Sequence, residues 1–439
     1  MAEIPSSLTQ PNGTLPPSWS SYMKDCYTSR QPPPLGSVSV NEIEQAAREK
    51  LKEYPNAFMY TFGAAGTSST HNGNLAEFQK WKIIPRMLRN VTDRNLETSL
   101  FGVNLRSPLL VAPIGVQGIV HPDGENGTAR AASKLGVPFV LSSAATRSLE
   151  AVAKANGSGH RWYQLYWTKS DDITVSLLSR AKASGYTTLV VTLDTQILGW
   201  RPHDINHAYI PFVHGVGCQI GFTDPVFMAQ WGQQPVSHDD VPTFPYDHKK
   251  TNAAIEAGDK DATLRAKLGQ EWVGETTSGY FRAWEDLKFL RENWEGPIVL
   301  KGIQAVQDAQ LAIENGIDGI IVSNHGGRQV DGAIPSLYAL RQICSNPKIK
   351  AAQESGKLTV LFDSGIRNGS DIFKAIAIGA QGILLGRPFV YGLAVAGEEG
   401  VEQVIRDILA DLEITLGLSG YKNLDEIRGK ADEVLVRLD

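Results

Sequence analysis

The chain has 439 residues, of which 42% are hydrophobic and 20% are charged, and its formal net charge is −5. This composition predicts a globular protein with a large core, and the scattered charges exclude the basic surface of a nucleic-acid-binding protein. The three cysteines, Cys26, Cys218 and Cys344, are far apart in the sequence and indicate neither a disulfide framework nor a cysteine-rich zinc site.

The termini carry no recognisable targeting signal. The first residues, MAEIPSSLTQPNGTLPP, lack a basic segment followed by an apolar one, and no stretch of the chain approaches 18 uninterrupted apolar residues. The final residues, EVLVRLD, do not form a peroxisomal tripeptide. We therefore expect a soluble, cytoplasmic protein without a membrane partner.

The N-terminal part divides into an arm and a lead-in. Residues 1–38 are rich in Pro, Ser and Gly, which predicts an extended arm. The segment VNEIEQAAREKL then has a helical pattern, and Asn41 and Glu44 have the spacing of a capping box. A lead-in containing Tyr60 follows, so we expect the main domain to span residues 39–439.

A repeated pattern begins at residue 109: a short apolar run, a polar or glycine-rich loop, and a helical stretch that ends in glycine. The eight runs are LLVAPIG (109–115), FVLSS (139–143), WYQLYW (162–167), TLVVTLD (188–194), IVLKG (298–302), GIIVSNH (319–325), TVLFDSG (359–365) and GILLGRP (382–388). Continuous apolar runs are typical of parallel strands that are buried on both faces. Glycines that precede strands, at Gly136, Gly185, Gly316 and Gly379, are predicted helix ends.

Eight strands alternating with helices predict an α/β fold, the (β/α)8 TIM barrel. A doubly wound open sheet is the alternative. The rhythm is broken after the fourth strand by residues 211–279, a polar, proline-containing stretch followed by DKDATLRAKLGQEW, which has helical character. An insertion at this point of a barrel lies on the catalytic face, so we expect a lid, with a disordered excursion as the alternative for its middle part.

Polar side chains follow six of the predicted strands, where a barrel places its active site. The strand-end residues are Gln164, Tyr166, Thr192, Asp194, Arg201, Lys301, Ser323, His325, Arg328, Asp363, Arg367, Gly386 and Arg387. Polar groups at so many strand ends must face a polar ligand or solvent, because a core would not accommodate them. The last two strands end in DSGIR and LGRP, and glycine with arginine at this point predicts a phosphate site.

These motifs carry a family resemblance. SNHGGRQ (323–329), preceded by LVVTLDTQILGWRPHD and followed by VLFDSGIRNGSDIFKAIAIGAQGILLGRPFVYG, closely resembles the FMN-dependent 2-hydroxy acid oxidases and dehydrogenases, the glycolate oxidase and lactate oxidase family. The resemblance covers roughly residues 40–400, and the matching motifs occur in a consistent order along the chain. It implies a TIM barrel with FMN at the carboxyl ends of the strands.

The resemblance also implies residue roles. His325 would take a proton from the substrate while two electrons pass to the flavin, with Asp194 paired to it. Arg201 and Arg328 would hold the substrate carboxylate. The implied catalytic residues are His325, Asp194, Tyr166, Arg201, Arg328, Tyr60 and Lys301. Those that would also bind substrate are Tyr60, Tyr166, Arg201, His325 and Arg328.

FMN is the implied cofactor, and no metal is expected. Lys301 would lie beside N1 and O2 of the flavin, where a cation favours the reduced ring. The other implied FMN contacts are Ala112, Pro113, Ile114, Gly115, Ser142, Gln164, Thr192, Ser323, Asp363, Ser364, Gly365, Arg367, Gly386 and Arg387.

The expected reaction is oxidation of a small (S)-2-hydroxy acid, lactate first, to the 2-keto acid, with molecular oxygen as acceptor. IPFVHGVG and FTDPVF in the insertion resemble lactate 2-monooxygenase, which implies that oxidative decarboxylation is an alternative outcome. Gly115, where many relatives carry alanine, predicts slightly more room over the flavin, and Ala144 predicts space for a bulkier acid. Relatives commonly form tetramers or larger assemblies, so we expect a homo-oligomer.

Other interpretations remain at this point. The substrate is alternatively a specialised 2-hydroxy acid of a biosynthetic route, or the protein is a flavin- or phosphate-binding barrel that performs isomerisation or amidation, or a barrel without catalytic activity. The arm is too short for the haem domain of a flavocytochrome. His203, His207, His214 and Cys218 imitate a zinc site, but Pro202 and the glycines of VHGVG favour a loop without metal.

Overall fold

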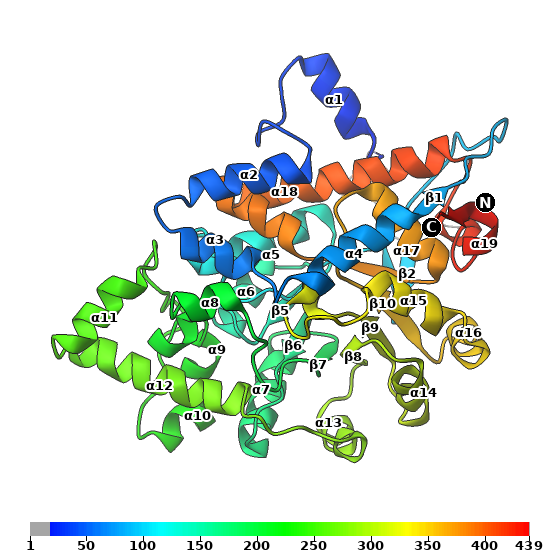
Figure 1. Cartoon of the computed structure of the whole chain (residues 1–439). Coiled ribbons are helices and arrows are strands. Elements are labelled where there is room, and N and C mark those ends of the chain that lie inside the picture. The colour runs from blue at the N-terminus through cyan, green and yellow to red at the C-terminus, as the bar shows by residue number, and fades with distance from the viewer. Residues whose placement is uncertain (1–17, 439) are drawn as a thin grey trace.

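A closed barrel of eight parallel strands forms the centre of the computed structural model, which describes residues 18–438 (Figure 1). The strands are β4 (Leu109–Val111), β5 (Phe139–Ser142), β6 (Arg161–Leu165), β7 (Leu189–Thr192), β8 (Ile298–Ile303), β9 (Gly319–Val322), β10 (Thr359–Phe362) and β11 (Gly382–Leu385). They follow chain order around the barrel, and β11 pairs with β4 to close it. Each strand lies within or against one of the predicted runs, so the TIM barrel is confirmed and the open sheet is excluded.

The strands are buried on both faces, which explains their continuous apolar runs. Each strand contributes one residue to a single apolar cluster inside the barrel: Leu110, Val140, Trp162, Val190, Val299, Ile321, Leu361 and Leu384. Leu100 and Leu105, on the antiparallel pair β2 (Thr98–Leu100) and β3 (Val103–Leu105), join this cluster. The neighbouring strand residues, such as Leu109 and Val111, belong to a second cluster shared with the surrounding helices.

The outer helices alternate with the strands, and glycine ends several of them. They are α5 (Gly124–Leu135), α6 (Leu149–Asn156), α7 (Asp171–Ala183), α13 (Leu287–Asn293), α14 (Val306–Glu314), α15 (Ser336–Cys344), α16 (Pro347–Glu354), α17 (Gly369–Ile378) and α18 (Arg387–Leu418). Gly136, Gly185, Gly316 and Gly379 follow α5, α7, α14 and α17 and all have positive φ angles. The predicted helix ends are therefore confirmed, and short loops lead from them into the next strands.

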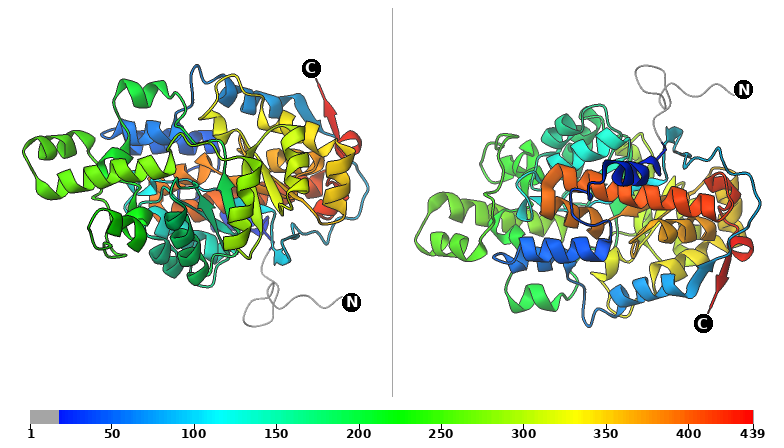
Figure 2. Two further views of the ribbon diagram at one scale, coloured as in Figure 1. Left: turned by 90° about the horizontal axis from the view of Figure 1, so that it is seen from below. Right: turned by 90° about the horizontal axis from the view of Figure 1, so that it is seen from above.

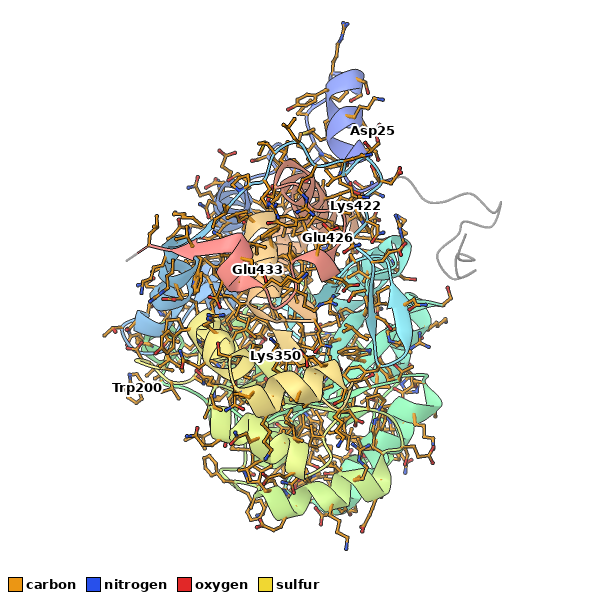
Figure 3. All side chains as sticks on the ribbon, turned by 90° about the vertical axis from the view of Figure 1, so that its right-hand side faces the viewer. Asp25, Trp200, Lys350, Lys422, Glu426 and Glu433 are labelled. Carbon is orange, nitrogen blue, oxygen red and sulfur yellow. The ribbon has the colours of Figure 1, made fainter. Side chains whose placement is uncertain are left out.

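The extended conformation expected for residues 1–38 is wrong for α1 (Ser21–Ser29), and residues 1–17 lie outside the described part of the chain. The prolines that suggested an extended arm flank this helix and do not interrupt it, and Arg30 ends it with a φ angle of 57°. No side chain of α1 is buried, and Asp25 lies far from the barrel in Figure 3. The arm is attached to α18 on both sides of α1, since Ser20 N donates to Glu413 (2.6 Å) and Leu35 N to Gln403 (2.6 Å).

The helix predicted to start with Asn41 as its N-cap begins earlier. In α2 (Val40–Lys50) the N-cap is Ser39, and Asn41 lies inside the first turn, so the capping box is wrong. Starting at Val40 buries Val40, Ile43 and Ala47 on one face of the helix. This apolar packing therefore decides where the helix begins.

Several elements precede or close the barrel. They are α3 (Pro55–Phe62), α4 (Ser69–Lys80), β1 (Trp81–Ile83), η2 (Gln117–Ile119), η4 (Trp284–Asp286), η6 (Leu424–Glu426), α19 (Ala431–Val434) and β12 (Leu435–Arg437). Strand β1 pairs antiparallel with β12, so the segment that follows α4 lies beside the C-terminal end of the described chain. No helix within residues 18–438 has both the length and the apolar character needed to cross a bilayer.

The insertion after β7 is folded and helical. It contains α8 (Pro202–Asn206), η3 (Pro211–His214), α9 (Gln219–Phe222), α10 (Pro225–Gln230), α11 (His248–Glu256) and α12 (Lys260–Thr276). Both views in Figure 2 show α11 and α12 projecting to one side of the barrel. The helix expected within DKDATLRAKLGQEW is confirmed as α12, and residues 231–247 are the longest stretch of the insertion without helix or strand.

Candidate active site

The chain makes a strained turn where β9 ends. His325, Gly326 and Gly327 have consecutive φ angles of 58°, 65° and 75°. Glycine adopts this left-handed region without penalty, but histidine does not, so the turn holds His325 in a conformation it would otherwise rarely adopt. Gly326 N donates to Ser364 Oγ after β10 (3.0 Å), and Gly327 N donates to Asn324 Oδ1 (3.1 Å). These bonds fix the turn in η5 (His325–Gly327).

His325 is paired with a carboxylate from a different strand. Its Nδ1 lies 2.8 Å from Asp194 Oδ1, and Thr195 Oγ1 lies 3.2 Å from the same nitrogen. Burial acts to raise the pKa of Asp194, but His325 and Lys301 outweigh it and hold that pKa well below its usual range. Burial lowers the pKa of His325, and the opposing effect of Asp194 does not restore it. The pair is therefore a carboxylate and a neutral imidazole at neutral pH, with Nε2 left for the pocket.

A buried lysine lies on the other side of Asp194. Lys301, on β8, donates to Ser323 Oγ (3.1 Å) and lies 3.7 Å from Asp363 Oδ2. Burial acts to lower the pKa of Lys301, but Asp363 and Asp194 outweigh it and raise the pKa. Lys301 therefore carries a positive charge inside the barrel mouth.

Two arginines meet next to His325. The guanidinium of Arg201 donates to the carbonyl of Arg328 (3.1 Å) and to Gln329 Oε1 (2.8 Å). Arg328 donates to the carbonyls of Thr61 (3.2 Å) and Gly63 (2.7 Å). Burial, followed by the nearby Arg201, lowers the pKa of Arg328 to about 9. Two positive charges so close together favour the binding of an anion.

A second pair of arginines lies where β10 and β11 end. Arg387, the first residue of α18, donates to the carbonyls of Thr61 (3.1 Å), Gly63 (3.1 Å) and Gly326 (3.0 Å). Burial lowers its pKa to about 10, and the nearby Arg367 acts in the same direction. The second arginine of this pair is Arg367. Within residues 18–438 no carboxylate forms an ion pair with Arg367, Arg387, Arg201 or Arg328.

Two tyrosines complete the polar part of the site. The ring of Tyr60, on α3, lies 5.5 Å from the guanidinium carbon of Arg328. Burial raises the pKa of Tyr60 above its ordinary value and raises the pKa of Tyr166 to about 12. Both phenols are therefore protonated at neutral pH and are available as hydrogen-bond donors.

Most of the residues singled out in the sequence line one pocket at the carboxyl ends of the strands. They are Tyr60, Ala112, Pro113, Ile114, Gly115, Tyr166, Arg201, Lys301, His325, Arg328, Asp363, Ser364, Gly365, Arg367, Gly386 and Arg387. Five others lie behind this surface: Ser142, Gln164, Thr192, Asp194 and Ser323.

The residues behind the surface form a hydrogen-bonded support. Gln164 Nε2 donates to Thr192 Oγ1 (2.9 Å), and Gln164 Oε1 accepts from Ser143 N (3.1 Å). Ser142 Oγ accepts from Ala144 N (3.2 Å). These side chains therefore hold the strand ends at which the pocket-lining residues lie, and all three are buried.

The pocket also contains residues that the sequence did not indicate. The barrel and its lead-in contribute Thr61, Val116, Ser143, Thr195, Leu198, Gly326, Ile366, Leu384 and Pro388, and the insertion contributes Phe212, Gly217, Trp272, Val273, Thr276 and Thr277. Gln329 was also missed, although it fixes Arg201 and donates to the carbonyl of Asp194 (2.7 Å). Placement of the insertion on the catalytic face was the only signal for its six residues.

The extra room expected at Gly115 is not present. A Cβ atom at Gly115 would lie 2.6 Å from the carbonyl oxygen and 2.7 Å from the Cβ of Ala144. The absence of a side chain therefore permits Gly115 and Ala144 to pack against each other, and opens no space over the cofactor site.

The histidines after β7 contact different residues. The loop expected after Pro202 is wrong, because residues 202–206 form α8 with proline at its first position. The His203 and His207 rings lie 4.3 Å apart, whereas His214 contacts Tyr246 OH (2.6 Å) and Asn252 Oδ1 (2.8 Å). In the part of the chain that the structure describes, no group of three His, Cys, Asp or Glu residues is arranged to hold a metal ion.

The donor set of the pocket fits FMN. Arg367 and Arg387, without carboxylate partners, lie beside the start of α18 and offer positive charge to a phosphate. Lys301 supplies a cation inside the barrel, and residues 112–115 line the same pocket. A planar, anionic cofactor therefore finds suitable groups at both of its ends.

The fold, the pocket and comparisons with known proteins define an FMN-dependent oxidoreductase. The model of the FMN-dependent dehydrogenase family matches residues 47–433. The chain is 44% identical to an FMN-dependent alpha-hydroxy acid dehydrogenase of Penicillium citrinum, over 93% of this chain and 95% of that one. It is 36% identical to an L-lactate oxidase of Lysinibacillus sphaericus, over 88% and 90%. A crystal structure of mandelate oxidase is 32% identical, covers 90% of this chain and 97% of its own, and has a TM-score of 0.70.

The chain therefore belongs to the FMN-dependent dehydrogenase family. Its cofactor is FMN, and its activity is the FMN-dependent oxidation of 2-hydroxy acids.

Proposed function

We propose that this pocket oxidises an (S)-2-hydroxy acid to the 2-keto acid and that molecular oxygen takes up the electrons. The observation that carries the proposal is the 2.8 Å contact between His325 and Asp194 in a pocket that Arg201 and Arg328 also line. A base beside a carboxylate-binding pair is the arrangement that removal of a proton from a 2-hydroxy acid requires.

His325 is the proposed base. With Nδ1 held by Asp194, Nε2 accepts the proton that leaves the substrate, and the carboxylate stabilises the imidazolium that results. Thr195 contacts both Asp194 Oδ1 (3.0 Å) and His325 Nδ1 (3.2 Å), so it helps to hold the ring in place.

Arg201 and Arg328 hold the substrate carboxylate, and Tyr60 and Tyr166 donate hydrogen bonds to it and to the hydroxyl side. Gln329 and the carbonyls of Thr61 and Gly63 orient the two guanidinium groups before substrate arrives. Binding in this way presents the α-carbon to His325 in one orientation, which is the main benefit of a rigid clamp.

FMN, when bound, supplies the acceptor for two electrons. We propose that Arg367, Arg387 and the glycines Gly365 and Gly386 hold its phosphate and ribityl chain. Lys301, Gln164, Thr192 and the turn at residues 112–115 are proposed to hold its ring system. The charge of Lys301 favours an anionic ring, because the lysine lies buried where water screens it poorly.

We further propose that residues 211–279 act as a lid, since six of these residues line the pocket. A lid that retains the 2-keto acid beside oxygen chemistry would favour oxidative decarboxylation, and early release would give the keto acid and peroxide. Product analysis after aerobic turnover distinguishes the two outcomes.

An assembly of subunits in the cytoplasm is also proposed. Helix α1 buries none of its side chains, and Tyr27 is 75% exposed, which supports packing of α1 against another subunit. The three cysteines are free thiols, which supports a reducing compartment.

The experiment that tests the proposal is anaerobic reduction of the purified protein by a panel of 2-hydroxy acids. We expect the visible flavin absorbance to bleach with at least one (S)-acid and not with its (R)-enantiomer. A flavoprotein that no 2-hydroxy acid bleaches would contradict the proposal and would favour isomerisation or amidation chemistry.

The pH dependence of flavin reduction should report His325. Because burial lowers its pKa from the ordinary value of 6.5, the base stays neutral until the pH falls below that value. We expect the limiting reduction rate to be constant at neutral pH and to fall at acidic pH with an apparent pKa below 6.5. In Asp194→Asn the acid limb should move to still lower pH, because the charge that opposes the shift is removed. Stopped-flow reduction at a series of pH values measures both; an acid limb above the ordinary histidine value in the wild type would contradict the role.

Replacing Arg387 with methionine should weaken FMN binding by about 10- to 100-fold, because a charge-assisted phosphate contact is lost. Titration of the apoprotein with FMN measures the affinity. Arg406→Met is the matched control, since Arg406 lies on the same helix and is 45% exposed. FMN affinity equal to that of the control would count against a phosphate role for Arg387.

A further inference from the structure

The part of the pocket formed by the insertion differs in chemistry from the part formed by the barrel. We call it the insertion wall: Phe212, Gly217, Trp272, Val273, Thr276 and Thr277. The charged side chains of the pocket, such as Arg201, Arg328 and Lys301, all come from the barrel and its own loops.

One side of the insertion wall is packed against the start of the barrel. A Cβ atom at Gly217 would lie 2.5 Å from Val116 Cγ1, so this glycine lets the insertion approach the loop after β4. The Phe212 ring lies 6.3 Å from the Tyr60 ring, edge to face. Helix α12 is in turn packed on η3, because a Cβ at Gly269 would lie 2.3 Å from the carbonyl oxygen of Phe212.

The other side is tied to the loops after β6 and β7. Glu275 accepts hydrogen bonds from Ser170 N (2.8 Å) and Ser170 Oγ (2.8 Å), and its carbonyl accepts from Lys169 N (2.9 Å). Gly279 N donates to the carbonyl of Gln196 (2.9 Å). The insertion wall is therefore attached at both edges, and its position over the pocket does not depend on a single contact.

The surface of the insertion wall is apolar although it contains two threonines. Thr276 Oγ1 donates to the carbonyl of Trp272 (3.0 Å), and Thr277 Oγ1 donates to that of Val273 (3.0 Å). Both hydroxyl protons are thus used within α12, and no charged residue belongs to the wall. Leu198, Ala144 and Val116 continue this apolar surface on the barrel side.

We propose that the enzyme prefers 2-hydroxy acids whose side chain is branched aliphatic or aromatic and carries no second charge, and that this side chain lies against the insertion wall. This inference rests on the proposed function, in which Arg201 and Arg328 hold the carboxylate. A methyl group, as in lactate, leaves most of the wall without a contact. Each additional buried methylene strengthens binding about fourfold.

The same wall disfavours a second charge on the substrate. A carboxylate that enters it loses its water shell and finds neither a cation nor a free hydroxyl proton there. A dicarboxylic 2-hydroxy acid such as malate should therefore be a poor substrate.

The test is anaerobic stopped-flow reduction of the FMN-loaded, full-length protein with (S)-lactate, (S)-2-hydroxy-4-methylpentanoate, (S)-3-phenyllactate, (S)-mandelate and (S)-malate. We expect the ratio of reduction rate to apparent Kd to be at least about tenfold larger for the best of the three apolar acids than for lactate, and smallest for malate.

Val273→Phe tests the position of the side chain. Filling the wall should lower the ratio of the best apolar acid to lactate by at least about tenfold. Gln270→Phe is the matched control, because Gln270 lies one turn earlier on α12 and is exposed. Retained FMN absorbance shows that each variant is folded.

Three results would overturn the inference. Flavin reduction by lactate that is as efficient as reduction by every larger acid, or more efficient, would contradict the preference while leaving the proposed function intact. An unchanged ratio in Val273→Phe would contradict the position of the side chain. A flavin that none of the acids reduces would remove the proposed function and this inference together.

Discussion

Replacing His325 with alanine is expected to lower the rate of flavin reduction by substrate by about 10²- to 10⁴-fold, the usual contribution of a general base. Asp194 holds the imidazole toward the pocket through the 2.8 Å contact with Nδ1. The proposed phosphate groups, Arg367 and Arg387, are unchanged in this variant. FMN should therefore stay bound, and only its reduction should be lost. Stopped-flow absorbance measures the rate, and absorbance of the purified protein measures FMN retention.

Two further variants make this experiment decisive. His325 has a φ angle of 58°, a conformation that asparagine adopts more readily than alanine, so His325→Asn removes the base with less backbone strain. His238→Ala is the matched control, because His238 is 53% exposed and its Nδ1 lies 3.4 Å from Glu150 Oε2, away from the pocket-lining residues. Reduction at the wild-type rate in His325→Ala or His325→Asn would overturn the assignment of the base.

Arg328→Met is expected to lower the ratio of reduction rate to apparent Kd by about 30- to 3,000-fold. This range corresponds to the loss of a buried, charge-paired contact. Methionine is similar in length but cannot bind a carboxylate, and the remaining Arg201 holds one end of the substrate only. The apparent Kd should rise and the limiting rate should fall, since the clamp both binds the acid and orients its α-carbon.

Arg328→Lys separates charge from shape in the same clamp. Lysine keeps the charge but lacks the planar pair of donors, so partial recovery of affinity with little recovery of rate is expected. Arg130→Met, at an arginine that is 43% exposed and paired with Glu398, controls for the loss of an arginine elsewhere. An unaltered rate of flavin reduction by substrate in Arg328→Met would show that the carboxylate is bound by other groups.

The barrel could be predicted from the sequence because its strands are determined locally. A strand buried on both faces needs a continuous apolar run, and all eight such runs became strands of one closed barrel. Glycine at the ends of α5 and α14, in the left-handed conformation, is an equally local signal. The strand-end polar residues follow from the same logic, since parallel strands of a barrel all end on one face.

Local signals failed where packing against distant residues decides the outcome. Helix α2 starts at Val40 because its apolar face packs, not because Asn41 caps it. Gly115 suggested open space, but Ala144, 29 positions later and on another loop, fills it. In both cases the residues that decide the outcome are not adjacent in the sequence to the residues they affect.

The sequence by itself determined the barrel, the residues at its strand ends and the position of the insertion, because the apolar pattern and the glycines act over a few residues. Only the tertiary structure decided which side chains meet. His325 and Asp194 are 131 positions apart, and Thr276 and Thr277 show an apolar face only because their hydroxyls turn back to α12. Contacts of this kind depend on how whole strands and helices pack, and this packing converts polar residues on separate loops into one pocket with an apolar wall.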